Sequence, residues 1–344
     1  MSEPVALKLT AKDFKSDQEV RWCPGCGDYA ILAAVQQFMP ELKIPRENIV
    51  FVSGIGCSSR FPYYMNTYGM HSIHGRAPAI ATGLSVSRPD LSVWVVTGDG
   101  DALSIGGNHL IHALRRNVNL KILLFNNRIY GLTKGQYSPT SEVGKVTKST
   151  PAGSADAPFN PISLALGAEA TFVARTIDSD RKHLQSVLRA AAEHQGSALV
   201  EIYQNCNIFN DGAFDPLKEP DTRDDFLIRL EHGQPIMFGK DDQFCVVHPP
   251  GGFGLEVRRT DLTPAEHILV HDATVADPAY AFALSRLPGL DLSNTPIGVF
   301  RSVNRPTYDS VVQTQVAEAR AAVSETPEQQ LAGLLNSGDT WTIL

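Results

Sequence analysis

The 344-residue chain is predicted to be an α/β protein with a doubly wound parallel sheet and a C-terminal extension. Short, nearly continuous apolar runs alternate with stretches that carry apolar residues at helical spacing. Such runs are typical of parallel strands, because helices cover both faces of a parallel sheet. The alternation continues to about residue 203 and then stops. We therefore expect one domain over residues 1–206 and an extension over residues 207–344.

The first predicted helix begins near a Cys-x-x-Cys pair and ends at Pro40. A buried strand follows at residues 49–52 and leads toward Cys57. The next elements are expected, in chain order, at 77–86 (helix), 92–97 (strand), 103–114 (helix), 120–125 (strand), 162–166 (helix), 170–174 (strand), 181–194 (helix) and 198–203 (strand). In the extension we expect a hairpin from 243–247 and 254–257, and helices over 277–287 and 308–323.

Composition excludes several classes of protein. The formal net charge is −7 and no basic cluster offsets it, so nucleic-acid binding is not expected. No segment approaches the roughly 20 apolar residues that span a bilayer, and residues 1–20 have no apolar leader. The five cysteines form an odd set without a leader, which favours metal or redox use over a disulfide framework. These observations predict a cytoplasmic protein that binds no membrane.

Two polar motifs follow neighbouring strands. Asp99 lies in the Gly-Asp-Gly-Asp segment 98–101, and Asn127 ends an Asn-Asn pair 28 positions later. Because both come at strand ends, their oxygens are expected to converge, and Mg²⁺ prefers such ligands beside phosphates. The glycines allow close backbone approach, and a helix beginning near Asp101 offers N–H groups to an anion. The Gly-Asp-Gly segment alone would more often be a surface turn.

Four cysteines are candidate metal ligands. Cys23 and Cys26 form the Cys-x-x-Cys pair, and Cys57 and Cys206 each follow a predicted strand. Four thiolates suit an iron–sulfur cluster or zinc, while a Cys-x-x-Cys pair alone could be a redox pair. The fifth, Cys245, lies in an apolar run and is expected to be buried.

Two further features could contact a substrate. Arg60 follows Cys57 closely, and its guanidinium is a candidate clamp for a substrate carboxylate, with a surface position or a diphosphate contact as alternatives. The polar segment 133–141 should follow the metal loop and order over cofactor or substrate, or else be a plain loop.

The segment 98–100 followed by the Asn-Asn pair resembles the thiamine-diphosphate motif of transketolase-like and decarboxylase-like enzymes. The resemblance implies that Mg²⁺ is held by Asp99, Asn127 and the backbone carbonyl of Ile129. A glutamate from another domain or chain activates the cofactor in such enzymes, and we find no second domain here that would supply it. An obligate partner chain is therefore expected.

Together with Trp-Cys-Pro-Gly-Cys-Gly (22–27), Gly-Ile-Gly-Cys-Ser (54–58) and His-Gly-Arg (74–76), these motifs resemble the beta subunit of 2-oxoacid:ferredoxin oxidoreductases over residues 22–209. That resemblance implies a [4Fe–4S] cluster on Cys23, Cys26, Cys57 and Cys206. It implies cofactor contacts at Ile55, Gly56, Cys57, Ser58, His74, Gly100, Asp101, Gly131 and Leu132. It also implies an alpha subunit as partner, in a heterodimer or a dimer of heterodimers, with ferredoxin and coenzyme A as reaction partners.

The expected reaction is reversible oxidative decarboxylation of 2-oxoglutarate to succinyl-CoA, with pyruvate as the rival substrate. One alternative is a non-redox thiamine decarboxylase subunit with structural zinc. Another is an electron-transfer module without catalysis, which the Gly-Asp-Gly and Asn127 pattern disfavours.

Overall fold

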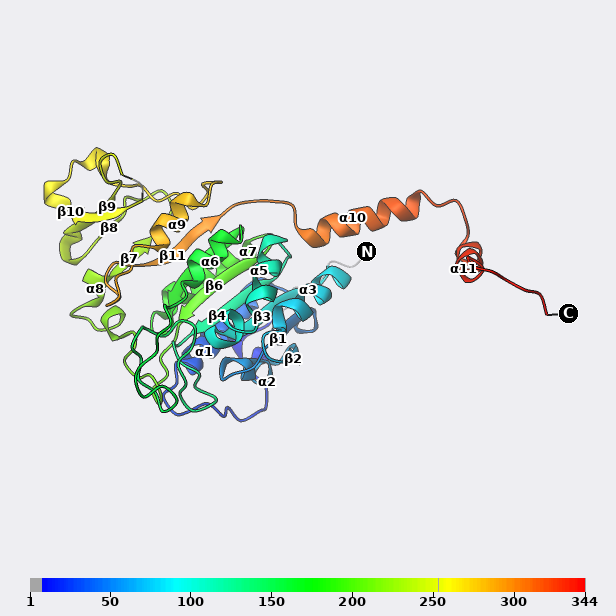
Figure 1. The fold of residues 1–344 in the computed structure, drawn as a ribbon, viewed down its shortest axis with the longest axis horizontal. Coiled ribbons are helices and arrows are strands. Elements are labelled where there is room, and N and C mark those ends of the chain that lie inside the picture. The colour runs from blue at the N-terminus through cyan, green and yellow to red at the C-terminus, as the bar shows by residue number, and fades with distance from the viewer. Residues whose placement is uncertain (1–7, 253, 344) are drawn as a thin grey trace.

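The computed structural model describes residues 8–252 and 254–343, and its fold is shown in Figure 1. An eight-stranded sheet forms the centre, in the order β2-β1-β3-β4-β6-β5-β11-β7. Its strands are β1 (Ile49–Ser53), β2 (Tyr68–His71), β3 (Ser92–Gly98), β4 (Lys121–Asn126), β5 (Phe172–Ile177), β6 (Ala198–Tyr203), β7 (Leu227–Leu230) and β11 (Thr295–Ser302). All neighbouring strands are parallel except β5 and β11. The predicted α/β fold is confirmed.

Helices cover both faces of the sheet. The α-helices of the described residues are α1 (Asp28–Phe38), α2 (Phe61–Tyr64), α3 (Ala77–Ser87), α4 (Asp99–Leu103), α5 (Gly107–Arg115), α6 (Pro161–Gly167), α7 (Arg181–Glu193), α8 (Arg223–Phe226), α9 (Ala279–Ser285), α10 (Tyr308–Ala321) and α11 (Pro327–Leu335), of which α10 and α11 lie outside these two layers. Along β3, Val93 and Val95 join a core with α3, α5 and α6, whereas Trp94 and Val96 join a core with α1 and α7. Burial on both faces explains why the strands read as continuous apolar runs.

The helix expected at 103–114 is divided in two. Helix α4 begins at Asp99, and α5 begins only at Gly107. The break brings Gly106 against Gly75, where a Cβ would lie 2.5 Å from the Gly106 nitrogen. The backbone therefore leaves the helical path at Ser104, and the loop that carries Gly75 packs against Gly106.

The extension contributes to the same sheet. Strands β7 and β11 continue it beyond β5, which the sequence did not predict. A small sheet of β8 (Met237–Phe238), β9 (Phe244–Val247) and β10 (Glu256–Arg259) contains the expected hairpin. The domain boundary at residue 206 stays a prediction.

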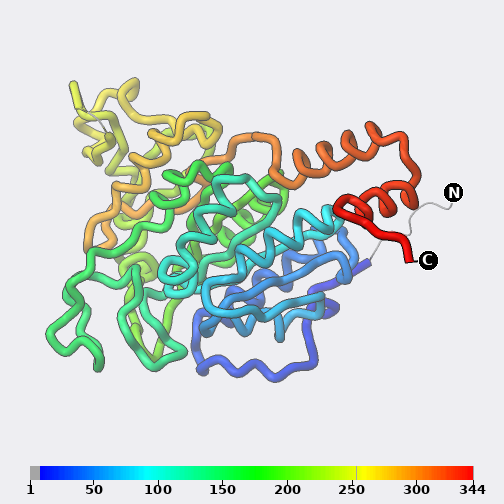
Figure 2. Tube along the Cα trace, turned by 45° about the vertical axis from the view of Figure 1, so that its right-hand side comes forward, coloured from blue at the N-terminus to red at the C-terminus, as the bar shows by residue number. Residues whose placement is uncertain are grey.

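The C-terminal arm, residues 308–343, leaves the body. Figure 1 and Figure 2 both show α10 running outward from the body, and Figure 1 shows α11 beyond it, near the C-terminus. The first turn of α10 is attached, because Asp309 Oδ1 accepts the Asn119 N–H at 2.8 Å. None of the helices in the described ranges could cross a bilayer, since each is too short or too polar.

Candidate functional site

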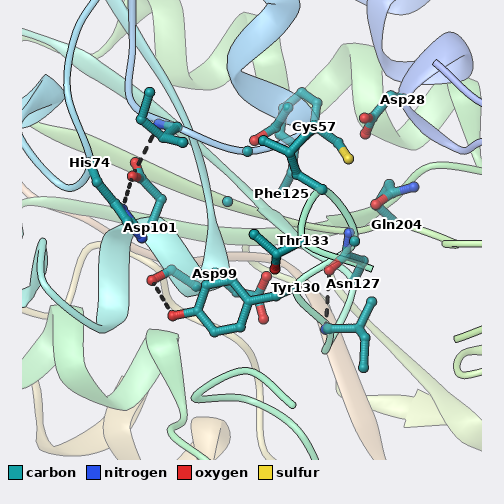
Figure 3. Close-up of a pocket in the computed structure, with 18 residues that line it drawn as sticks. Asp28, Cys57, His74, Asp99, Asp101, Phe125, Asn127, Tyr130, Thr133 and Gln204 are labelled. Atoms are coloured by element: carbon teal, nitrogen blue, oxygen red, sulfur yellow. Dashed lines mark hydrogen bonds and ion pairs between the residues drawn. The ribbon is translucent and has the colours of Figure 1, made fainter. Parts of the chain in front are cut away.

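A pocket lies where β1, β3 and β4 end (Figure 3). These strands are parallel, so their carboxyl ends meet at one edge of the sheet. The predicted cofactor and Mg²⁺ residues all line it, namely Ile55, Gly56, Cys57, Ser58, His74, Asp99, Gly100, Asp101, Asn127, Ile129, Gly131 and Leu132. Two further lining residues, Gly98 and Thr133, belong to the segments 98–101 and 133–141 noted in the sequence, whereas Asp28, Phe125, Tyr130 and Gln204 were not singled out.

Asp99 is the buried carboxylate of this pocket, with 3% of its surface exposed. It opens α4 directly after the extended backbone of Gly98. Its Oδ2 accepts hydrogen bonds from the hydroxyls of Ser138 at 2.5 Å and Thr140 at 2.6 Å. Burial raises the pKa of Asp99 to about 6, although the two hydroxyls act in the opposite direction. A cation beside it would favour the ionised form.

Asn127 opens the loop that follows β4. Its Oδ1 accepts the N–H of Ile129 at 3.2 Å, and its backbone carbonyl accepts from Asn210 at 2.9 Å. Tyr130, which follows Ile129 in this loop, donates its hydroxyl to the Gly100 carbonyl at 2.9 Å. A Cβ at Gly100 would lie 2.2 Å from the Tyr130 ring, so only glycine fits there. The carboxylate, amide and carbonyl oxygens at this edge are a donor set that suits Mg²⁺.

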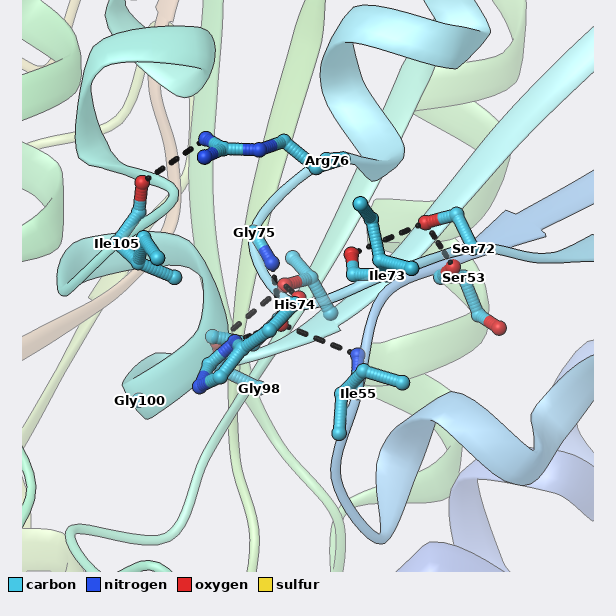
Figure 4. Close-up of polar contacts among 12 residues, drawn as sticks. Ser53, Ile55, Ser72, Ile73, His74, Gly75, Arg76, Gly98, Gly100 and Ile105 are labelled. Carbon is cyan, nitrogen blue, oxygen red and sulfur yellow. Dashed lines mark hydrogen bonds and ion pairs between the residues drawn. The ribbon is translucent and has the colours of Figure 1, made fainter.

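Asp101, labelled in Figure 3, holds together the loops that carry Ile55 and His74, which are labelled in Figure 4. Its Oδ1 accepts from the Ile55 N–H at 3.1 Å, the Gly75 N–H at 2.8 Å and His74 Nδ1 at 2.6 Å. Its Oδ2 accepts from Thr97 at 2.7 Å. With both oxygens bonded to the protein, the side chain positions its neighbours, and a contact from Asp101 to a diphosphate would come from its main chain. Because Nδ1 of His74 faces Asp101, its Nε2 is the nitrogen available to the pocket.

Two of the predicted thiol ligands lie against the pocket. A Cβ on the pocket residue Gly131 would be 3.5 Å from the sulfur of Cys57 and 3.5 Å from that of Cys206. On the other side of Cys57, Trp22 donates its indole N–H to the Cys57 carbonyl at 2.7 Å and is itself 6% exposed. Cys26 Sγ accepts from Gln204, another pocket residue, at 3.3 Å. The thiols and the cofactor pocket are therefore adjacent.

Burial raises the pKa of the Cys57 thiol to about 12 and that of Cys26 further, and the proximity of the other thiols adds to both shifts. Thiolates in this position need a compensating cation, which a metal cluster would supply. No three His, Cys, Asp or Glu side chains within residues 8–252 and 254–343 stand in the arrangement of a single-ion site. All five cysteines are free of disulfides, and Cys23 is exposed.

Arg60 is not among the residues that line the pocket. Its guanidinium donates to the Arg21 carbonyl at 3.1 Å and lines a separate hollow with Tyr63 and Tyr64. Its predicted role toward a substrate carboxylate stays a prediction. Cys245 is fully buried on β9, as expected.

Asp28 is a functional candidate that the sequence reasoning missed. It is 1% exposed, lines the pocket, and has no hydrogen-bond partner for its carboxylate in the described part of the chain. Burial, together with the charge of Asp178, raises its pKa to about 7. Its place two residues after the Cys-x-x-Cys pair was the only available signal.

Comparison with known families agrees with this geometry. Residues 54–202 match the family model described as "Thiamine pyrophosphate enzyme, C-terminal TPP binding domain". The matched segment contains the Gly-Asp-Gly and Asn-Asn motifs and most of the pocket lining.

Relatives extend the likeness to most of the chain. The "2-oxoglutarate oxidoreductase subunit KorB" of Mycobacterium tuberculosis is 67% identical over 96% of this chain and 88% of its own length. The "2-oxoacid:ferredoxin oxidoreductase subunit beta" of a Sulfolobus species is 48% identical, over 55% of this chain and 63% of its own. A solved structure of "2-oxoglutarate:ferredoxin oxidoreductase from Magnetococcus marinus with 2-oxoglutarate, coenzyme A and succinyl-CoA bound" is 35% identical with a TM-score of 0.75. The aligned region covers 95% of this chain and 96% of the chain in that structure.

Proposed function

Because the chain belongs to the family of 2-oxoacid:ferredoxin oxidoreductase beta subunits, we propose that it forms, with an alpha subunit, an enzyme that oxidatively decarboxylates 2-oxoglutarate. The products are succinyl-CoA, carbon dioxide and reduced ferredoxin. The preference for 2-oxoglutarate over pyruvate is supported by the names of the relative that is 67% identical and of the solved structure.

One observation carries this proposal: the oxygen donors at Asp99 and Asn127 line the same pocket as Cys57. A Cβ on the pocket residue Gly131 would lie 3.5 Å from the sulfurs of both Cys57 and Cys206. Thiamine diphosphate supplies the carbon nucleophile and the electron sink for loss of carbon dioxide. A [4Fe–4S] cluster supplies a one-electron acceptor. Adjacent sites for the two groups are what an oxidative, rather than a simple, decarboxylase requires.

The chain's own residues would bind and orient these groups. Asp99, Asn127 and the carbonyl of Ile129 would hold Mg²⁺, and Cys23, Cys26, Cys57 and Cys206 would hold the cluster. His74, whose Nδ1–H is bonded to Asp101, would as an imidazolium also donate from Nε2 to a diphosphate oxygen. Trp22 and Tyr64, whose rings meet edge-on at 4.8 Å, would exclude water from the thiol side.

The activating glutamate and a second wall of the active site would come from the alpha subunit. The C-terminal arm is proposed to contact that subunit, because it exposes large apolar side chains at Leu331, Leu334 and Trp341. Ferredoxin would receive electrons from the face that carries the exposed Cys23.

The test is the visible and EPR spectrum of the anaerobically purified complex, coexpressed with its alpha subunit, before and after addition of 2-oxoglutarate and coenzyme A. We expect a brown protein whose cluster is reduced only when both compounds are present, and an enzyme that then reduces ferredoxin. A matched Cys57→Ser complex should lose the cluster signal, whereas a Cys245→Ser complex should keep it.

A colourless, zinc-loaded complex that still releases carbon dioxide would overturn the redox proposal and leave a plain decarboxylase. Reduction of the cluster by pyruvate but not by 2-oxoglutarate would overturn the substrate assignment alone.

A further inference from the structure

Three hydroxyl side chains close the loop that begins at Asn127. Ser138, Thr140 and Ser141 are each only 2–3% exposed, although they belong to a segment without helix or strand. A buried hydroxyl is costly unless it is hydrogen-bonded, so such a group has a structural or functional reason to be there. Their partners identify that reason.

Two of the hydroxyls bond the same carboxylate oxygen. Ser138 Oγ lies 2.5 Å and Thr140 Oγ1 lies 2.6 Å from Asp99 Oδ2. Hydrogen bonds to an ionised carboxylate are short and strong, and two of them on one oxygen fix the rotation of the group. In the described part of the chain no hydroxyl bonds Oδ1, which leaves that oxygen for a cation.

Thr140 is also part of a buried polar network beneath the site. Its Oγ1 also lies 2.8 Å from the acceptor Asn126 Oδ1, so the single hydroxyl proton of Thr140 can be donated either to Asp99 or to this amide oxygen. Asn126 Nδ2 in turn donates to Glu201 at 2.7 Å. Glu201 is paired with Arg175 at 2.6 Å, with both side chains at most 2% exposed. The network runs from the loop at Thr140 through β4 and β6 to β5, so the rigid sheet supports the orientation of Thr140.

The same hydroxyls fix the loop itself. Ser141 Oγ donates to the Arg128 carbonyl at 2.6 Å and accepts the Ser138 N–H at 2.8 Å. The loop, residues 127–141, thus starts at one proposed metal ligand and is attached at its end to the other. Between these ends it carries Tyr130, Gly131 and Leu132 into the pocket.

We propose that Ser138 and Thr140 are positioning residues that hold Asp99 in the orientation required to bind the divalent cation of thiamine diphosphate. This inference rests on the proposed function, because it assigns supports to the metal site of that function. It differs from the sequence-based expectation for segment 133–141, which placed this segment over the cofactor. Groups that orient a metal ligand typically change metal affinity by about 10–100-fold when they are removed.

The test compares four variants of the coexpressed complex with the wild type: Thr140→Val, Thr140→Ser, Ser138→Ala and Ser85→Ala. Ser85 is a control, because it is equally buried and bonds the Asn119 carbonyl at 3.0 Å, on a helix outside the site. The Kd of Mn²⁺, used as a probe for Mg²⁺, is measured by EPR at saturating thiamine diphosphate. Thermal unfolding is measured without metal.

We expect Thr140→Val and Ser138→Ala each to raise the Kd of Mn²⁺ by about 10-fold or more. Thr140→Ser should stay close to the wild type because it keeps the hydroxyl, and Ser85→Ala should leave the Kd unchanged. If Thr140→Val does not fold, Ser138→Ala decides. The inference would be overturned if the folded variants that lack a hydroxyl bind Mn²⁺ with a Kd within twofold of the wild type and only their Tm is lowered. The two hydroxyls would then have a purely structural role. A wild-type complex that binds no thiamine diphosphate would instead overturn the proposed function itself.

Discussion

The edge of the sheet around Asp99 buries carboxylates and pairs them with hydrogen-bond donors, whereas the C-terminal arm leaves apolar side chains exposed to solvent. At the edge, carboxylates such as Asp99 and Asp101 are buried and bonded to several donors. In the arm, apolar side chains are exposed, with Leu334 at 73% and Trp341 at 84%. The first region is fixed by its own contacts, whereas the second offers contacts that this chain does not use.

The difference separates two functions. A metal site needs its ligands held to within a fraction of an ångström, which demands buried, mutually supporting bonds. A partner-binding arm needs exposed surface, and its residues contribute little to the stability of the isolated chain. Substitutions at the edge and in the arm should therefore have opposite effects on cofactor binding and on assembly.

The largest expected effect is at Asp99. Asp99→Asn removes the charge of the proposed metal ligand, and we expect at least about 100-fold weaker Mg²⁺ binding, since even supporting residues contribute 10–100-fold. Calorimetry with thiamine diphosphate present measures this. Assembly with the alpha subunit should be unchanged. Wild-type metal affinity in this variant would contradict the assignment of the edge as the metal site.

The buried ion pair should matter next. Glu201→Gln leaves Arg175 buried without its charged partner, which typically costs about 3–5 kcal/mol of unfolding free energy. Urea unfolding of the chain measures the loss. The matched control is Glu41→Gln, because the Glu41–Arg189 pair is about 44% exposed on both sides and should contribute at most about 1 kcal/mol. An equal loss of unfolding free energy in the two variants would contradict the expectation that the buried ion pair matters more to stability than the exposed one.

Acid should weaken the body of the protein through its buried histidines. Burial lowers the pKa of His194 from 6.5 to about 4, while the unfolded chain protonates this group near 6.5. Between these values the unfolded state binds more protons, so the stability due to His194 is lost as pH falls from 6.5 toward 4. Urea unfolding at several pH values should show the difference between the wild type and His194→Gln shrinking over this window. A difference in unfolding free energy that stays constant between pH 6.5 and pH 4 would contradict the lowered pKa of His194.

The smallest effect on stability is expected from the arm. Removal of residues 322–344 should change the unfolding free energy of the chain by less than about 0.5 kcal/mol, because these residues make few contacts with the body. The same truncation should weaken assembly with the alpha subunit, measured by size-exclusion chromatography of the coexpressed complex. Unchanged assembly would show that the arm is not the partner-binding element.

Local patterns were sufficient for much of the fold, and the family resemblance of the motifs supplied most of the pocket lining. The apolar runs predicted β1, β3, β4 and β6, and strand ends that carry Asp99 and Asn127 could be placed at one edge because parallel strands share a direction. The edge strand β2 and the two strands from the extension, β11 and β7, escaped prediction. β2 is exposed along its length, so it lacks an apolar run, and β11 pairs with β5 across more than 100 residues.

The sequence by itself determined the motifs and most elements up to residue 203, because these follow from spacing and residue chemistry. The list of residues that could bind the cofactor came from the resemblance of those motifs to a known family. Only the tertiary structure decided what supports them. Ser138 and Thr140 meet Asp99 about 40 positions away, and the buried carboxylate of Asp28 has no hydrogen-bond partner among the described residues. Such contacts depend on how distant segments pack, and hydrogen bonding between them leaves no periodic signal in the chain.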